Sequence, residues 1–174
     1  GQFSNRCYSE SVKQAFIDFR IKAIDEGRYD PDSDEILTNQ WSRIIVHLPY
    51  AFQGKRMFPD VFRHDRRELP MWSKIVEEIG PEPFPSDYAD TPEGIEEFEK
   101  ANDYYRRLIS KTDEFRTFVD ERIEKTQRAS SLIGNQYTGS IFLALMSAME
   151  SDYLEGVEIE SNRIGLCGYG SGAK

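Results

Sequence analysis

Cysteine and histidine are both scarce in this sequence, which contains two of each among its 174 residues. Two cysteines, Cys7 and Cys167, are too few for a disulfide framework and show no spacing typical of a metal site. No apolar run approaches the ~18 residues that a membrane-spanning helix needs, and no basic segment followed by an apolar one marks a secretion signal. We therefore expect a globular protein of the cytoplasm that holds no metal.

Acidic charge is concentrated in one part of the chain. The net charge is −9, and the segment 77–124 alone carries 15 acidic and 6 basic residues, so the remainder is balanced. The segment 41–67 is locally basic, with six lysines and arginines against two aspartates. This distribution would steer an anionic ligand toward 41–67 and makes duplex DNA or RNA a poor candidate for a partner.

Hydrophobic periodicity predicts an α/β protein. Two short apolar runs, 44–46 and 164–167, are typical of buried strands, the second of them central in its sheet. The segment 132–134 is expected to be extended, and the proline-rich segment 80–92 is expected to be a loop. Helices are expected over 8–24, over 53–62 with a possible break at Pro59, over 70–79 and 95–109, over 115–123 with Thr112 as a cap, and from Tyr137 onward.

A histidine, His47, stands at the end of the first predicted strand. Pro49 ends the strand's hydrogen bonding two residues later, because proline has no N–H to donate. Ligands of open α/β sheets bind at the carboxyl ends of strands, and histidine titrates in the range that suits acid–base chemistry. His47 is therefore a candidate catalytic residue, although a lone histidine at a strand end is more often structural.

The segment 131–149 contains a second candidate. Residues 141–146 are apolar on all sides, which is typical of a buried helix. Asn135 precedes this helix, where an amide donor could stabilise a developing oxyanion. The alternative is that Asn135 is only a turn residue and helix cap.

The segment 163–172 ends in a glycine-rich stretch, Gly168-Tyr169-Gly170-Ser171-Gly172, which would let the backbone approach a ligand closely. Its spacing fits neither a dinucleotide fingerprint nor a phosphate loop. Ser171 has no evident base beside it in the sequence, so we interpret it as a hydrogen-bond donor and not as a nucleophile.

Four stretches together resemble the C-terminal half of hydroxymethylglutaryl-CoA synthase, a member of the thiolase superfamily. They occur in the family's order: Phe3-Ser4-Asn5-Arg6-Cys7-Tyr8, then His47-Leu48-Pro49-Tyr50, then Gly134-Asn135-Gln136-Tyr137-Thr138-Gly139-Ser140, and finally the glycine-rich stretch 168–172. The resemblance implies a thiolase-like C-terminal half over 1–174, with a mixed central sheet, a buried helix and an outer helical insert at about 53–125. It also implies a fragment of a longer protein and an incomplete fold.

The family condenses acetyl-CoA with acetoacetyl-CoA in the mevalonate pathway of isoprenoid synthesis, with no cofactor besides these thioesters. The resemblance implies that His47 polarises the acetoacetyl group, that Asn135 and Ser171 line its site, and that Tyr137 and Tyr169 lie nearby. Pro49 belongs to the same motif as His47. The nucleophilic cysteine and the glutamate base would lie in the N-terminal half, so this chain alone should be inactive. The full-length enzyme is expected to be a homodimer.

Two departures concern the CoA contact. Where the family usually has lysines five and nine residues after the histidine, this chain has Phe52 and Arg56, with Lys55 beside the second. Arginine can still grip a phosphate, but phenylalanine cannot. One alternative is therefore a β-branching synthase that acts on carrier-protein-bound acetoacetyl groups in polyketide synthesis. Another is a non-catalytic thiolase-like subunit. Cys167 faintly resembles the catalytic cysteine of thiolases.

Overall fold

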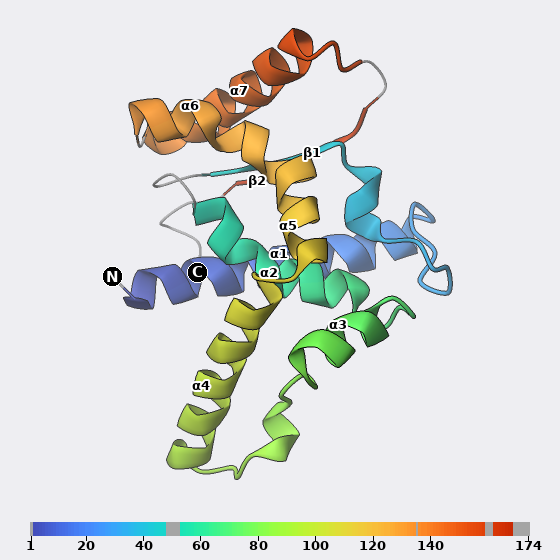
Figure 1. The fold of residues 1–174 in the computed structure, drawn as a ribbon, viewed down its shortest axis with the longest axis vertical. Coiled ribbons are helices and arrows are strands. Elements are labelled where there is room, and N and C mark those ends of the chain that lie inside the picture. The colour runs from blue at the N-terminus through green and yellow to red at the C-terminus, as the bar shows by residue number, and fades with distance from the viewer. Residues whose placement is uncertain (1, 48–52, 135, 159–161, 169–174) are drawn as a thin grey trace.

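The computed structural model describes residues 2–47, 53–134, 136–158 and 162–168 of the chain (Figure 1). Helices dominate this part, and its sheet consists of two short strands. In chain order the elements are α1 (Gln2–Asp25), the 3-10 turn η1 (Leu37–Gln40), β1 (Arg43–Val46), α2 (Gln53–Arg66), α3 (Trp72–Ile79), the 3-10 turn η2 (Pro85–Asp87), α4 (Pro92–Ile109), α5 (Asp113–Val119), the π-helical segment η3 (Asp120–Glu124), α6 (Lys125–Ile133), the 3-10 turn η4 (Tyr137–Gly139), α7 (Ser140–Leu154) and β2 (Ile164–Cys167).

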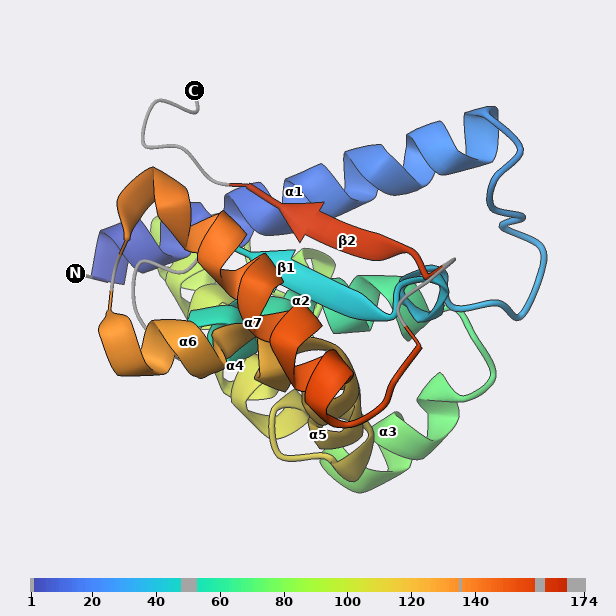
Figure 2. The same ribbon diagram turned by 90° about the horizontal axis from the view of Figure 1, so that it is seen from above.

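The two strands pair in parallel, with Arg43 opposite Ile164 and Val46 opposite Cys167. Helices α6 and α7 lie on one face of the sheet, and α1 and α2 lie on the other (Figure 1, Figure 2). This arrangement confirms the predicted α/β class and both predicted strands. The expected mixed strand order is not seen in the described sheet, which is parallel, and β2 is an edge strand there and not a central one.

Side chains of β1 alternate between two cores, because successive residues of a strand point to opposite faces. Ile44 and Val46 are buried in the large core shared with α1, α2, α4 and α5. Ile45 points the other way and packs with Ala144 and Ala148 of α7. The small alanine side chains leave room for α7 to approach the strand closely.

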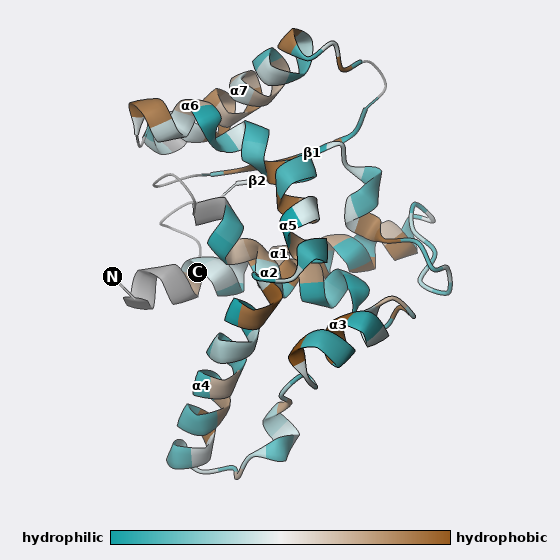
Figure 3. Cartoon of the chain, viewed as in Figure 1, coloured by the Kyte–Doolittle hydropathy of each residue, from teal (hydrophilic) through white to brown (hydrophobic). Residues whose placement is uncertain are grey.

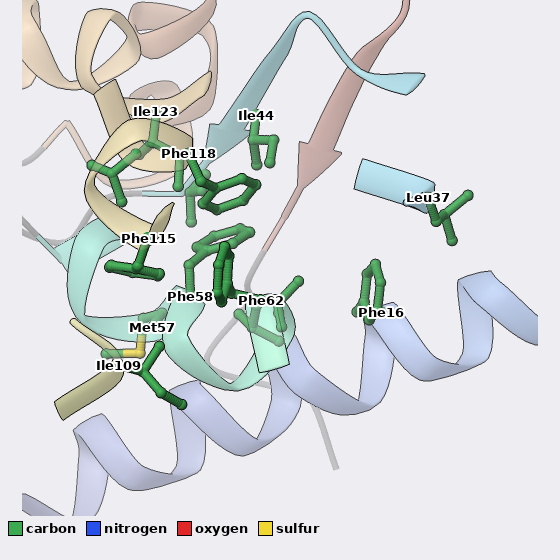
Figure 4. Packing of buried hydrophobic residues seen from close by; sticks show 14 of the residues in the cluster. Phe16, Leu37, Ile44, Met57, Phe58, Phe62, Ile109, Phe115, Phe118 and Ile123 are labelled. Carbon is green, nitrogen blue, oxygen red and sulfur yellow. The ribbon is translucent and has the colours of Figure 1, made fainter. Parts of the chain in front are cut away.

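Aromatic side chains fill the centre of the large core (Figure 4). The ring of Phe62, from α2, lies 5.3 Å from that of Phe115 and 5.5 Å from that of Phe118, measured between centroids. The first of these pairs is edge-to-face, a geometry that aromatic quadrupoles favour. This cluster joins α2 to α5 and so holds the outer helices against the layer beneath the sheet.

Buried ion pairs add to this attachment. Arg63 of α2 lies 3.0 Å from Asp60, one turn earlier, and 3.5 Å from Glu82 in the loop after α3. Arg106 of α4 lies 3.0 Å from the other carboxylate oxygen of Asp60. Removal of one partner would leave a buried charge uncompensated, so these contacts fix α4 and the 80–84 loop relative to α2. The limits of the insert, about 53–125, stay a prediction.

Three local predictions met different outcomes. Thr112 caps α5 as expected, since its hydroxyl accepts a hydrogen bond from the N–H of Phe115 at 3.3 Å. Helix α2 does not break at Pro59 but continues to Arg66, and the burial of neighbouring side chains in the aromatic core offsets the lost backbone hydrogen bond. The extended conformation predicted for 132–134 was wrong: α6 continues to Ile133 and ends at Gly134, whose φ of 89° favours glycine.

Helix α7 is buried on one face only. Ser140, Ala144 and Ala148 are buried, whereas the exposed fractions of Phe142 and Met146 are both 66%. Figure 3 shows apolar residues along α6 and α7. The prediction of burial on all sides was therefore wrong for this chain, because the described elements cover only the side of α7 that faces β1 and α6. Among these elements, no helix is both long and apolar enough to span a membrane.

Phe62→Ala should lower the free energy of unfolding by about 3–5 kcal/mol, because it removes a fully buried ring and leaves a cavity. Urea denaturation followed by circular dichroism measures this change. Tyr104→Ala is the matched control: this ring is 62% exposed, so the change should stay within about 0.5 kcal/mol. Equal losses in the two variants would contradict the central place given to Phe62.

Candidate active site

Three segments of the chain hold His47. Its N–H donates to the carbonyl of Cys167 at 3.0 Å, which extends the β1–β2 pairing by one residue. Its carbonyl accepts a hydrogen bond from the hydroxyl of Tyr8 in α1. The imidazole Nδ1 lies 2.9 Å from the Oγ of Ser140, the first residue of α7. Both the backbone and the ring of His47 are thus fixed at the carboxyl end of β1.

Contacts at the opposite end of β1 fix the direction of α7. Arg43, the first residue of the strand, forms an ion pair with Asp152 near the end of the helix. Lys125 of α6 reaches the same carboxylate at 3.2 Å. At the carboxyl end of β1, His47 contacts Ser140 at the start of α7. Helix α7 therefore crosses the strand with a polar contact at each end, and Ile45 packs against the helix between these contacts.

Burial lowers the pKa of His47 below its usual value. The imidazole is therefore neutral at pH 7, with one nitrogen that carries a hydrogen and one that accepts. Such a ring can donate a hydrogen bond to a substrate oxygen without carrying a charge. The other histidine, His64, is also neutral, since burial and the nearby Arg67 and Arg63 lower its pKa to about 4.

The thiol of Cys167 is not an activated nucleophile. Burial raises its pKa to about 11, and the thiolate is the reactive form of cysteine. The contribution of Cys167 to this site is its backbone carbonyl, which accepts the hydrogen bond from His47. No group of three or more histidine, cysteine, aspartate or glutamate side chains in the described ranges could hold a metal ion.

The structure brings only part of the predicted site together. Tyr137 begins the turn that leads into Ser140, is 76% exposed and has a φ of 49°, which is unusual for a residue with a side chain. Four predicted residues lie outside the described part of the chain, so their positions relative to His47 stay predictions; these are Pro49, Asn135, Tyr169 and Ser171.

Lys55 and Arg56 lie in the first turns of α2, shortly after the strand. Lys55 forms an ion pair with Glu124 of the π-helical segment. The Arg56 side chain is exposed, and its backbone carbonyl accepts a hydrogen bond from Arg106 at 3.5 Å. Part of the positive charge expected to meet an anionic ligand is therefore balanced within the chain.

Sequence reasoning missed Tyr8 and Ser140 as partners of His47. Tyr8 and Ser140 are each the last residue of a stretch that carries the family resemblance, 3–8 and 134–140. That position was the only available signal, because neither residue type suggests a contact with a histidine 39 or 93 positions away.

A cavity of about 690 Å³ lies between α1 and β2, with Phe19, Trp41 and Leu166 in its lining. His47 is not among the lining residues. Cys167, whose carbonyl accepts the hydrogen bond from His47, is among them. The cavity therefore lies next to the strand that carries the histidine, and we assign no substrate to it.

A parallel strand pair between helical layers, with a histidine at the carboxyl end of one strand, is the arrangement of an α/β domain that binds ligands at strand ends. The family model for the C-terminal part of hydroxymethylglutaryl-coenzyme A synthase matches residues 1–174. The chain therefore belongs to this family.

Two relatives of this chain are named as members of the same family. The chain is 29% identical to the hydroxymethylglutaryl-CoA synthase of Haloferax volcanii over 174 residues and covers 36% of that protein. It is 27% identical to the Saccharomyces cerevisiae synthase over 182 aligned positions, with 99% of this chain and 33% of the yeast protein covered. The chain thus spans about a third of the length of these relatives.

A solved structure shares the fold. The structure of MvaS in complex with 3-hydroxy-3-methylglutaryl coenzyme A matches 99% of this chain and 33% of the solved chain, with a TM-score of 0.66 and 24% sequence identity. This match confirms the predicted thiolase-like fold class.

Stability should fall as the pH decreases from about 6.5 to about 4, because the folded chain keeps His64 neutral while the unfolded chain protonates it. In this range the unfolded state binds more protons, so protonation favours unfolding. Glutamine cannot titrate, so His64→Gln should lose less stability than the wild type between pH 7 and pH 5. Urea midpoints at the two pH values measure the difference, and identical losses would contradict the assigned pKa.

Proposed function

We propose that this chain forms the C-terminal part of a hydroxymethylglutaryl-CoA synthase, which condenses acetyl-CoA with acetoacetyl-CoA in the mevalonate pathway. Membership of the family over residues 1–174 supports the proposal, as do the two relatives that carry this activity in their names. The observation that carries it is the anchored His47 at the carboxyl end of β1.

The reaction begins with acyl transfer. A cysteine sulfur attacks the acetyl-CoA thioester, so that a new carbon–sulfur bond forms and CoA leaves as its thiol. A glutamate then removes a proton from the acetyl methyl group. The resulting carbanion attacks the ketone carbon of acetoacetyl-CoA, and the ketone oxygen takes up a proton. Water finally cleaves the cysteine thioester and releases the product. We place this cysteine and this glutamate in the part of the full enzyme outside this chain.

His47 donates a hydrogen bond to the ketone oxygen of the acetoacetyl group in this scheme. Negative charge develops on that oxygen as the carbanion attacks, so a fixed donor there lowers the barrier. The lowered pKa of His47 supports a neutral donor. Asn135 and Ser171 line the acetoacetyl site, and three further residues, Tyr137, Tyr169 and Pro49, complete the pocket.

The CoA moiety contacts the start of α2 in this proposal. Arg56 supplies positive charge there, and Lys55 would exchange its Glu124 partner for phosphate. The MvaS structure with its CoA thioester supports binding of this ligand class. No cofactor is needed besides the two thioesters.

The full enzyme is proposed to act as a cytoplasmic homodimer. The length of the relatives, about three times that of this chain, supports an additional N-terminal half that carries the nucleophile. The apolar side of α7 that is exposed in this chain includes Phe142 and Met146. This surface supports contacts between α7 and the N-terminal part of the full enzyme.

A β-branching synthase that accepts acetoacetyl groups from a carrier protein is the second candidate. Two observations favour it: Phe52 stands where the family has a lysine, and Lys55 is engaged with Glu124. Both reduce the positive charge available to the CoA phosphates. A non-catalytic thiolase-like subunit is the third candidate, and the placement of His47 argues against it.

His47→Ala in the complete protein should lower the condensation rate at least ~100-fold, because the donor to the ketone oxygen is lost. Acetylation of the nucleophilic cysteine by acetyl-CoA should continue at a similar rate. Consumption of acetoacetyl-CoA and incorporation of radiolabelled acetyl groups measure the two steps.

His64→Gln is the matched control, since it replaces the other histidine of this chain without touching the site; it should retain both activities. Loss of acetylation in His47→Ala would reject the assigned role. Turnover only with a carrier-tethered acetoacetyl group would establish the second candidate, and inactivity of the wild type with both substrates would establish the third.

A further inference from the structure

The contact between Ser140 and His47 fits either tautomer of the neutral imidazole, because a serine hydroxyl can donate to a bare Nδ1 or accept from Nδ1–H. The Oγ of Ser140 lies 2.9 Å from Nδ1, and the serine is completely buried. We propose that Ser140 is a positioning residue that donates its hydroxyl hydrogen to Nδ1 and so keeps the ring proton of His47 on Nε2. The catalytic consequence rests on the function proposed above.

The chemistry of a neutral imidazole gives this contact its effect. One ring nitrogen carries a hydrogen and the other accepts, so the direction of the hydrogen bond at one nitrogen fixes the state of both. The function proposed above needs a donor on Nε2, which leaves Nδ1 as the acceptor of the Ser140 hydrogen. A hydroxyl hydrogen directed at Nδ1 requires a lone pair there, which places the ring hydrogen on Nε2. Nε2–H is the form that can donate to a ketone oxygen.

The position of Ser140 is itself determined by the packing of α7. The Arg43–Asp152 ion pair holds the far end of the helix, and the contact of Ile45 with Ala144 and Ala148 sets its distance from the strand. The hydrogen bonds of Tyr8 and Cys167 engage backbone atoms of His47, whereas the contact with Ser140 engages the ring. Ser140 is the contact among these that orients the ring.

Burial makes the contact specific. An exposed serine hydroxyl that loses its partner can form a hydrogen bond with water instead. The buried hydroxyl of Ser140 has no such replacement, so loss of the contact would leave its hydrogen bond unsatisfied. Loss of the hydroxyl should therefore redistribute the ring proton between the two nitrogens and loosen the ring.

Nitrogen-15 NMR of the complete protein tests the proposal directly, because protonated and unprotonated ring nitrogens have well-separated chemical shifts. Signals of His47 are identified by their loss in His47→Asn. The wild type at pH 7.5 should show an unprotonated Nδ1 and a protonated Nε2.

Ser140→Ala should raise the fraction of the Nδ1–H form and lower kcat for condensation about tenfold, with kcat/KM lowered to a similar extent because the lost interaction acts in the transition state. Ser140→Cys keeps a weak donor of similar size, so it should recover part of the rate. Circular dichroism establishes that each variant is folded.

Ser147→Ala is the matched control. Ser147 is also buried on α7, but it bonds to α6, accepting from the N–H of Ala129 at 3.1 Å and donating to the carbonyl of Lys125 at 2.9 Å. This variant should lose stability while the ring proton of His47 and kcat remain unchanged.

Two results would overturn the proposal: a wild type whose His47 carries its proton on Nδ1, or a folded Ser140→Ala variant with unchanged tautomer and rate. The first of these results overturns the proposal even if Ser140→Ala fails to fold, and Ser140→Cys then tests the contribution of the hydroxyl. Absence of condensation by the wild type would reject the proposed function alone, because the NMR measurement does not depend on activity.

Discussion

The crossing of α7 over β1 is the constraint on which the candidate site depends. Two polar contacts define it, the Arg43–Asp152 ion pair at the start of the strand and the Ser140–His47 hydrogen bond just beyond its end. Between them, Ala144 and the neighbouring small residues allow a close approach. A bulkier side chain in this seam would force the helix away from the strand and so separate Ser140 from His47.

Charge in this chain is used mainly to hold elements together. Most of the basic residues of 41–67, which the sequence suggested as an attractor for anions, are balanced by acidic partners: Arg43 by Asp152, Lys55 by Glu124, Arg63 by Asp60 and Glu82, Arg66 by Asp65, and Arg67 by Glu82. Composition counts charges but not their partners, so the expected steering toward this segment is weaker than the sequence suggested.

Local patterns predicted the elements well and their partners poorly. The short apolar runs at 44–46 and 164–167 predicted the two strands, and the apolar periodicity of 8–24 and 95–109 predicted α1 and α4. Helix α6, Lys125–Ile133, was not predicted, because Leu132 and Ile133 fit a strand as well as a helix. The exposure of one side of α7 could not be predicted. The residues of this helix are apolar on all sides, and their pattern does not show which side other elements of this chain cover.

The position of His47 at a strand end could be predicted, but the hydrogen bond from Ser140 required the tertiary structure, because it joins residues 93 positions apart. Sequence patterns suggested Asn135 and Ser171 as hydrogen-bond donors, but only the family resemblance placed them in one acetoacetyl site together with Tyr169.

A crystal structure of the complete protein with acetoacetyl-CoA bound would test the central claim most directly. The account predicts that Nδ1 of His47 stays within hydrogen-bonding distance of Ser140 Oγ while Nε2 faces the ketone oxygen of the acetoacetyl group. An imidazole turned away from Ser140, or a ketone oxygen bound by other groups with His47 remote from it, would contradict the account.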